Sequence, residues 1–189
     1  MELRTNRFIL RSIDPNIDDL TRYLSWLTDE DSSPFIEGVS ANWSLAKVSD
    51  YVRYKNTSES TIFLGIFTQS ENIHIGNIKL EPIVEKSYTY LGILIGEIAW
   101  RGRKVGAEVI SNILDFAFES LNLIEVRLGV NHRNLAANRL YLKLGFNERV
   151  DLRSTNSKVM SIDAKNWSLQ RGKVIEEIDK YLENLTIES

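Results

Sequence analysis

Two stretches decide the fold, and the first is residues 92–108, GILIGEIAWRGRKVGAE. Its apolar start is typical of a strand, its glycines indicate a tight loop, and its end begins a long helical pattern. A helix N-terminus offers unpaired backbone N–H groups and a partial positive charge, which suit a phosphate. Arg101, Arg103 and Lys104 add three positive charges. The stretch therefore indicates a pyrophosphate-binding loop or, alternatively, a plain strand-to-helix turn with solvated cations.

The common phosphate motifs do not fit this loop. A Walker loop ends in Gly-Lys-Ser or Gly-Lys-Thr, which is absent here. The dinucleotide fingerprint should follow the first strand of a βαβ unit, whereas this loop follows several consecutive strands.

Outward from this loop, apolar periodicity predicts a mixed sheet with helices on its faces. The expected strands are 8–10, 61–68, 73–80, 88–95, 125–130 and 159–162. The expected helices are 17–27, one capped by Ser44, then 105–121, 134–144 and 171–185, with Gly145 ending the fourth. We expect the first strands to be consecutive and antiparallel.

The second decisive stretch is residues 130–146, VNHRNLAANRLYLKLGF. An asparagine-started helix that ends in Leu-Tyr, two residues and Leu-Gly-Phe resembles the acetyl-CoA-binding core of the GNAT superfamily. Residues 5–11, TNRFILR, are similar to the opening of the branch that acetylates ribosomal-protein N-termini. Polyamine acetyltransferases share much of this pattern. The resemblance covers roughly residues 3 to 167.

The resemblance implies a GNAT-like α/β fold, with a mixed, mostly antiparallel central sheet of about six to seven strands and helices on both faces. We expect residues 1–167 to form the acetyltransferase domain, and residues 168–189 to form an amphipathic helix that packs on it or extends it.

The resemblance also implies the residues that bind acetyl-CoA. The strand from Tyr90 to Ile95 would splay from the strand 125–130, and the pantetheine arm would lie between them. The implied cofactor-binding residues are Leu94, Ile95, Arg101, Gly102, Arg103, Lys104, Val105, Gly106, Ala107, Asn134, Asn138 and Tyr141. In the family a glycine usually stands where this chain has Lys104. If that position needs a positive φ, a lysine costs about 1–2 kcal/mol. Its ammonium could compensate by reaching a CoA phosphate, or the loop could be distorted and cofactor binding weakened.

For catalysis, the resemblance implies that Tyr141 gives a proton to the departing CoA sulfur, although a packing role is the alternative. An amine with a pKa of about 10.4 must lose a proton before it attacks. Glu97, after the strand 88–95, is the base that we expect. Glu81 and His132 are alternatives, and each of the three could instead be a plain surface residue.

The composition of the chain argues against several kinds of bond and site. The chain has 189 residues, a net charge of −3, no cysteine and two histidines that lack metal-ligand spacing. We therefore expect no disulfide, no acyl-cysteine intermediate and no metal. We also expect a cytoplasmic monomer or homodimer, with no nucleic-acid or membrane partner.

The sequence thus predicts an acetyl-CoA-dependent N-acetyltransferase. Its acceptor would be a primary amine, on a peptide N-terminus or a small molecule, that attacks directly in a ternary complex. The acidic loop 29–43 could attract that amine or could be a solvated face. Two alternatives stay open: an aminosugar acetyltransferase on the same fold, and a non-catalytic acyl-CoA-binding module.

Overall fold

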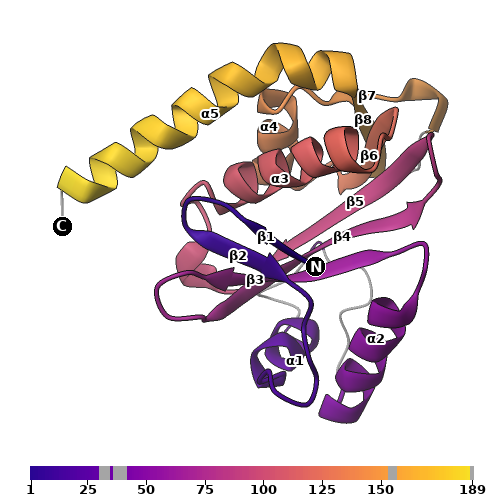
Figure 1. The fold of residues 1–189 in the computed structure, drawn as a ribbon, viewed down its shortest axis with the longest axis vertical. Coiled ribbons are helices and arrows are strands. Elements are labelled where there is room, and N and C mark those ends of the chain that lie inside the picture. The colour runs from indigo at the N-terminus through magenta and orange to yellow at the C-terminus, as the bar shows by residue number, and fades with distance from the viewer. Residues whose placement is uncertain (30–34, 36–41, 153–156, 188–189) are drawn as a thin grey trace. The chain divides into compact units, whose positions relative to one another are not determined.

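The computed structural model describes residues 1–29, 35, 42–152 and 157–187. The chain divides into two compact units (Figure 1). Unit 1 comprises Met1–Ile83 and Leu91–Arg103, and unit 2 comprises Val84–Tyr90 and Lys104–Ser189. Strand β5 (Tyr88–Ile95) gives residues to both units.

The strands form one mixed, mostly antiparallel sheet of eight strands in the order β1-β2-β3-β4-β5-β6-β8-β7. The predicted fold class is therefore confirmed. Two strands were not predicted, β1 (Glu2–Arg4) and β7 (Asn147–Glu148). Strands this short carry too few residues to show an alternating pattern.

Unit 1 is built on antiparallel strands with two helices on one face of them (Figure 1). Besides β1 and part of β5, its elements are β2 (Phe8–Arg11), α1 (Thr21–Thr28), α2 (Leu45–Thr57), β3 (Ile62–Thr68), β4 (His74–Ile83) and a 3-10 turn (Ile98–Trp100). Buried apolar side chains of these helices, among them Trp26 and Val48, share one core cluster with Phe63 of β3. As predicted, Ser44 caps α2, and its hydroxyl accepts a hydrogen bond from the Lys47 N–H.

The first helix begins later than predicted. The sequence favoured residues 17–27, whereas α1 spans Thr21–Thr28. The Asp18 carboxylate accepts the Asp14 N–H at 2.8 Å, so the segment before α1 is held in turns. Ile17 is consequently 83% exposed rather than packed on the core. Short acidic side chains compete with helical hydrogen bonding in this way.

Unit 2 carries the longest described helix, α5 (Ala164–Ile187), which has 24 residues. Besides β7 and part of β5, its elements are α3 (Val105–Asp115), a π-helical turn (Phe116–Ser120), β6 (Glu125–Asn131), α4 (Leu135–Lys143), a 3-10 turn (Val150–Leu152), β8 (Ser157–Asp163) and α5 (Ala164–Ile187). Strand β6 pairs antiparallel with β8, and its parallel pairing with β5 covers Tyr88–Tyr90. The splay predicted for the rest of β5 stays a prediction.

The last helix is longer than predicted and begins at Ala164 instead of residue 171. Its first turns pack on α3, where the Asp115 carboxylate accepts hydrogen bonds from Trp167 Nε1 at 2.7 Å and Arg171 Nε at 2.8 Å. The predicted division at residue 167 stays a prediction. None of the helices in the described part of the chain is both long and apolar enough to cross a membrane.

Candidate functional site

The loop before α3 has the unusual backbone that its sequence predicts. Gly102 has φ +75° and Lys104 has φ +56°, so two of three successive residues lie in the left-handed region. Apart from its chain neighbours, no described residue has an atom within 4 Å of a Cβ added at Gly102. The positive φ of Lys104 confirms the concern that its sequence raised, because a left-handed lysine costs about 1–2 kcal/mol.

The Lys104 ammonium lies against α5. Its Nζ donates a hydrogen bond to the Glu177 carbonyl oxygen at 3.1 Å and lies 3.6 Å from Glu177 Oε2. This contact joins residues that are 73 positions apart, so no local sequence signal could have predicted it. A phosphate contact for Lys104 stays a prediction.

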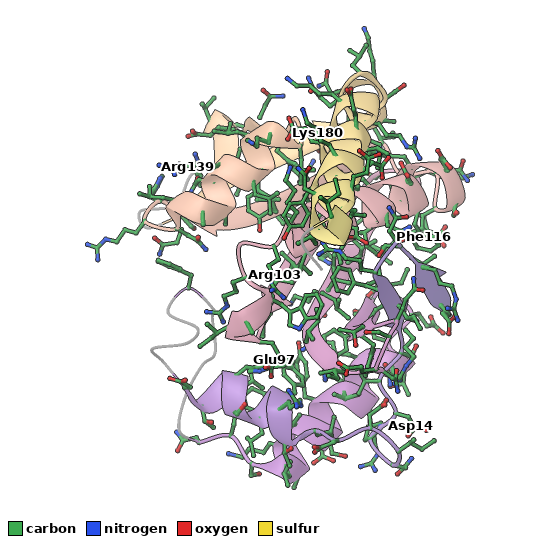
Figure 2. All side chains as sticks on the ribbon, turned by 90° about the vertical axis from the view of Figure 1, so that its left-hand side faces the viewer. Asp14, Glu97, Arg103, Phe116, Arg139 and Lys180 are labelled. Carbon is green, nitrogen blue, oxygen red and sulfur yellow. The ribbon has the colours of Figure 1, made fainter. Side chains whose placement is uncertain are left out.

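The two arginines of the loop bind within unit 1. Arg101 donates from Nε to the Ile95 carbonyl at 2.8 Å and from a terminal nitrogen to the Gly96 carbonyl at 3.2 Å, which ties the loop to the end of β5. The Arg103 guanidinium lies 5.6 Å from the centre of the Trp100 ring (Figure 2). The structure thus shows structural contacts for both arginines, and their predicted phosphate contacts stay predictions.

Gly106 serves close packing of helices rather than an unusual dihedral angle. It is helical, and a Cβ added there would lie 2.8 Å from Leu140 Cδ2 on α4. Val105 is buried beside it, and Ala107 is half-buried.

Helix α4 holds a buried amide with an unused acceptor. Asn134 caps α4, as predicted, with its Oδ1 accepting the Ala137 N–H at 3.1 Å. Asn138 is 9% exposed and donates from Nδ2 to the carbonyls of Asn131 and Asn134. Its Oδ1 has no hydrogen-bond partner among the described residues. A buried unpaired acceptor costs about 1–3 kcal/mol, so this atom suits a ligand that brings an N–H.

Tyr141 lies one turn after Asn138 on the same helix. Its side chain is 7% exposed, and its ring centre lies 5.8 Å from that of Phe146. The phenol makes no hydrogen bond to any described residue. Burial raises the pKa of Tyr141 to about 12, so the hydroxyl keeps its proton at neutral pH. Both packing and proton donation are compatible with this placement.

The end of β5 approaches β4 closely. A Cβ added at Gly76 would lie 2.2 Å from the Leu94 carbonyl oxygen, so only glycine fits opposite Leu94. Leu94 also packs against the apolar core under α1 and α2. The roles of Leu94 and Ile95 in binding the cofactor stay predictions.

Glu97 follows β5 and lies against α1 (Figure 2). Its Oε1 is 3.0 Å from the Arg22 guanidinium, and its N–H donates to the Ile75 carbonyl at 3.1 Å. Arg22 therefore positions the carboxylate that the sequence favoured as the base. Arg22 itself was missed, because charged residues on a surface helix face are common.

The alternative bases have different surroundings. Glu81 accepts hydrogen bonds from Lys55, Lys79 and the Thr61 hydroxyl. Partial burial alone would raise the pKa of Glu81, but the hydrogen bonds from Lys55 and Lys79 outweigh it and hold the pKa below its usual value. His132 is exposed after β6. Of the acidic loop 29–43, only Asp29, Phe35, Asn42 and Trp43 are described, so Glu30, Asp31 and Glu37 lie outside the described residues.

Solved structures share this fold. An acetyltransferase of the GNAT family from Bacillus anthracis is 13% identical, with a TM-score of 0.74 over 87% of this chain and 99% of that chain. A spermidine N-acetyltransferase from Vibrio cholerae, in complex with CoA and spermine, is 20% identical, with a TM-score of 0.71 over 85% of this chain and 97% of that chain.

Sequence comparison adds a relative and a family. A protein of Bacillus subtilis (strain 168) described as a probable N-acetyltransferase, YjcK, is 29% identical over 104 residues, which is 54% of this chain and 56% of that protein. This chain thus spans about half the length of the curated relative that it matches. The family model described as an acetyltransferase (GNAT) domain matches residues 7–147. The protein therefore belongs to the GNAT acetyltransferase family.

Proposed function

We propose that this protein is an N-acetyltransferase that moves the acetyl group of acetyl-CoA to a primary amine by direct attack in a ternary complex. The observation that carries the proposal is that Asn138 and Tyr141 lie three residues apart on α4. Residues three apart on a helix are neighbours. Asn138 presents a buried acceptor that has no partner among the described residues, and Tyr141 presents a buried hydroxyl that keeps its proton.

The residues of unit 2 fit acetyl-CoA. The N–H groups at the start of α3, from Val105 to Ala107, and the partial charge of that helix suit the pyrophosphate. Asn138 Oδ1 suits an amide N–H of the pantetheine arm, and Asn134 lies one turn before it. The resemblance to GNAT acetyltransferases leads us to assign further residues of unit 1 to the same cofactor: Leu94, Ile95, Arg101, Gly102 and Arg103.

Acetyl-CoA supplies an acetyl group activated as a thioester. The chain's own residues then manage two protons. Tyr141 holds one proton on its phenol and donates it to the leaving sulfur. Glu97, which Arg22 keeps in place at 3.0 Å, accepts the proton of the incoming amine, directly or through water. Holding an amine neutral at pH 7 costs about 4–5 kcal/mol, so this base contributes substantially.

Direct attack fits the composition, because the chain contains no cysteine that could carry the acetyl group. The acceptor that we propose is a small-molecule amine or a peptide N-terminus. Polyamines belong among the candidates, because the Vibrio cholerae neighbour is named for spermidine. We further propose that the protein works in the cytoplasm, as a monomer or homodimer, and without a metal.

The test is release of free CoA thiol from acetyl-CoA with a panel of peptides, polyamines, small amines and aminosugars, beside calorimetric binding of CoA. We expect CoA binding and turnover with one amine class. Turnover confined to aminosugars would favour that alternative on the same fold. CoA binding without turnover on any amine would favour the non-catalytic module. Absence of CoA binding would overturn all three.

A further inference from the structure

The residue just before α3, Lys104, is joined to the middle of α5 by its ammonium. Lys104 Nζ lies 3.1 Å from the Glu177 carbonyl oxygen and 3.6 Å from Glu177 Oε2. Lys143 Nζ, at the end of α4, lies 3.8 Å from the same Oε2. The Lys104 ammonium is also 5.9 Å from the centre of the Tyr181 ring, one turn further along α5.

Other contacts hold α5 on the rest of unit 2. The Asp115 carboxylate of α3 binds Trp167 and Arg171 near the start of α5 at 2.7–2.9 Å. Val174 and Ile178 are 8% and 3% exposed, so their side chains anchor the same helix in the core. The Glu177 carboxylate is therefore not needed to keep α5 in place, and its charge acts chiefly on the lysines beside it.

The position of Lys104 makes that charge matter. Lys104 is the residue before the first turn of α3, where a helix attracts anions. The phosphates of a nucleotide cofactor and the Glu177 carboxylate are both anions that the same ammonium can pair with. An ammonium paired with Glu177 must leave that carboxylate before it can pair with a phosphate.

We propose that Glu177 competes with the phosphates of CoA for Lys104, so that the C-terminal helix lowers the affinity of the protein for its cofactor. This inference rests on the proposed function, because it assigns a regulator to the same cofactor site. Glu177 is a positioning residue here, since it acts through Lys104. A partner or modification that displaced α5 would tighten cofactor binding.

The effect is modest because the ion pair is partly exposed. The side chains of Lys104 and Glu177 are 33% and 44% exposed. Exposed pairs are typically worth about 0.2–1 kcal/mol, so removing the competitor should raise the affinity by about fivefold at most.

The experiment measures the Kd of CoA by calorimetry for the whole chain and for Glu177→Gln at two salt concentrations. Glu176→Gln is the matched control, because Glu176 is the exposed neighbour on α5 and pairs with no described residue. We expect Glu177→Gln to bind CoA more tightly, by about fivefold at most. Its binding should also depend more steeply on salt, since Lys104 then pairs with a phosphate without first losing a carboxylate. Glu176→Gln should match the unmodified chain.

A second background tests the route through Lys104. Lys104→Met keeps the side-chain length and the left-handed strain but removes the charge, so Glu177→Gln should have no effect in that background. A Glu177→Gln variant that binds CoA equally or more weakly overturns the inference alone, as does an effect that persists beside Lys104→Met. An unmodified chain that binds no CoA overturns the proposed function and, with it, this inference.

Discussion

Tyr141 in unit 2 and the carboxylates Glu81 and Glu97 in unit 1 have opposite surroundings. Tyr141 is buried and has no hydrogen-bond partner among the described residues, and burial raises its pKa to about 12. The carboxylates instead lie beside cations: Glu97 at 3.0 Å from Arg22, and Glu81 beside Lys55 and Lys79.

The difference indicates which group can serve which step. A proton donor needs a hydroxyl that stays protonated and is not already hydrogen-bonded within the protein. Burial keeps the Tyr141 hydroxyl protonated, and no described residue accepts a hydrogen bond from it. A base needs a charged carboxylate that a substrate can reach. Among the described residues, Glu97 pairs with one cation, Arg22, whereas Glu81 is shared by two lysines, one of which, Lys55, is 7% exposed. We therefore assign Glu97 to chemistry and Glu81 to structure.

The largest effect that we expect is from Tyr141→Phe. The change removes only the hydroxyl, so the ring keeps its packing on Phe146. Because a thiol with a pKa of about 8.5 is already a fair leaving group, losing its proton donor should lower kcat by about a hundredfold at neutral pH. The measurement is thiol release on the true acceptor.

Binding of CoA and the melting temperature serve as controls for Tyr141→Phe. Both should stay close to those of the unmodified chain, because the hydroxyl makes no hydrogen bond to the described residues. Part of the lost rate should return as pH rises and more of the amine is neutral. Full turnover in this variant would show that Tyr141 is only a packing residue.

The helix that carries Tyr141 was predictable because its signals are local. Asn134 at the N-cap, apolar residues at contact spacing and Gly145 at φ +94° lie within twelve residues, and α4 begins and ends where they indicate. The same holds for the loop before α3, whose glycine and lysine both adopt a positive φ.

The contacts of the candidate site were not predictable, because they join distant residues. The sequence shows neither that Arg22 meets Glu97 nor that Glu177 holds Lys104. The sequence also misplaced the start of α1. The Asp18 carboxylate accepts the Asp14 N–H, and this hydrogen bond holds the segment before α1 in turns. Periodicity records which face of an element is apolar, and it carries no information about which charged residues meet across the fold.

The two carboxylates should differ when each is neutralised. Glu81→Gln leaves buried Lys55 without its carboxylate, so it should cost about 1.5–3 kcal/mol of unfolding free energy with kcat unchanged. Glu97→Gln should instead lower kcat by about a hundredfold or less, with an unfolding free energy close to that of the unmodified chain. Denaturant unfolding and thiol release measure the two quantities. The reverse pattern would exchange the two assignments.

His74 in unit 1 resembles Tyr141, because burial also keeps it uncharged. It is 5% exposed, and its Nε2 lies 2.9 Å from both the Gly76 carbonyl and Asn77 Oδ1, so the proton sits on Nε2. Its Nδ1 has no hydrogen-bond partner among the described residues. Burial lowers the pKa of His74 more than its hydrogen bonds to Asn77 and Gly76 raise it.

The smallest effect that we expect is therefore a loss of stability as the pH falls from about 6.5 to about 5. Because the pKa of His74 is lower in the folded chain than its unfolded value of about 6.5, the unfolded chain binds more protons below that pH. Stability is full above about pH 6.5 and falls by up to about 1.4 kcal/mol per pH unit as the pH drops toward the folded pKa. Asp18 and Glu81, whose pKa values are lowered, lose their contributions only near pH 4, below this window.

Denaturant unfolding across the window should show the slope in the unmodified chain and in His132→Gln, which changes an exposed histidine, but not in His74→Gln. A flat profile in the unmodified chain would mean that burial does not hold His74 uncharged. The comparison of His74 with Tyr141 would then be wrong.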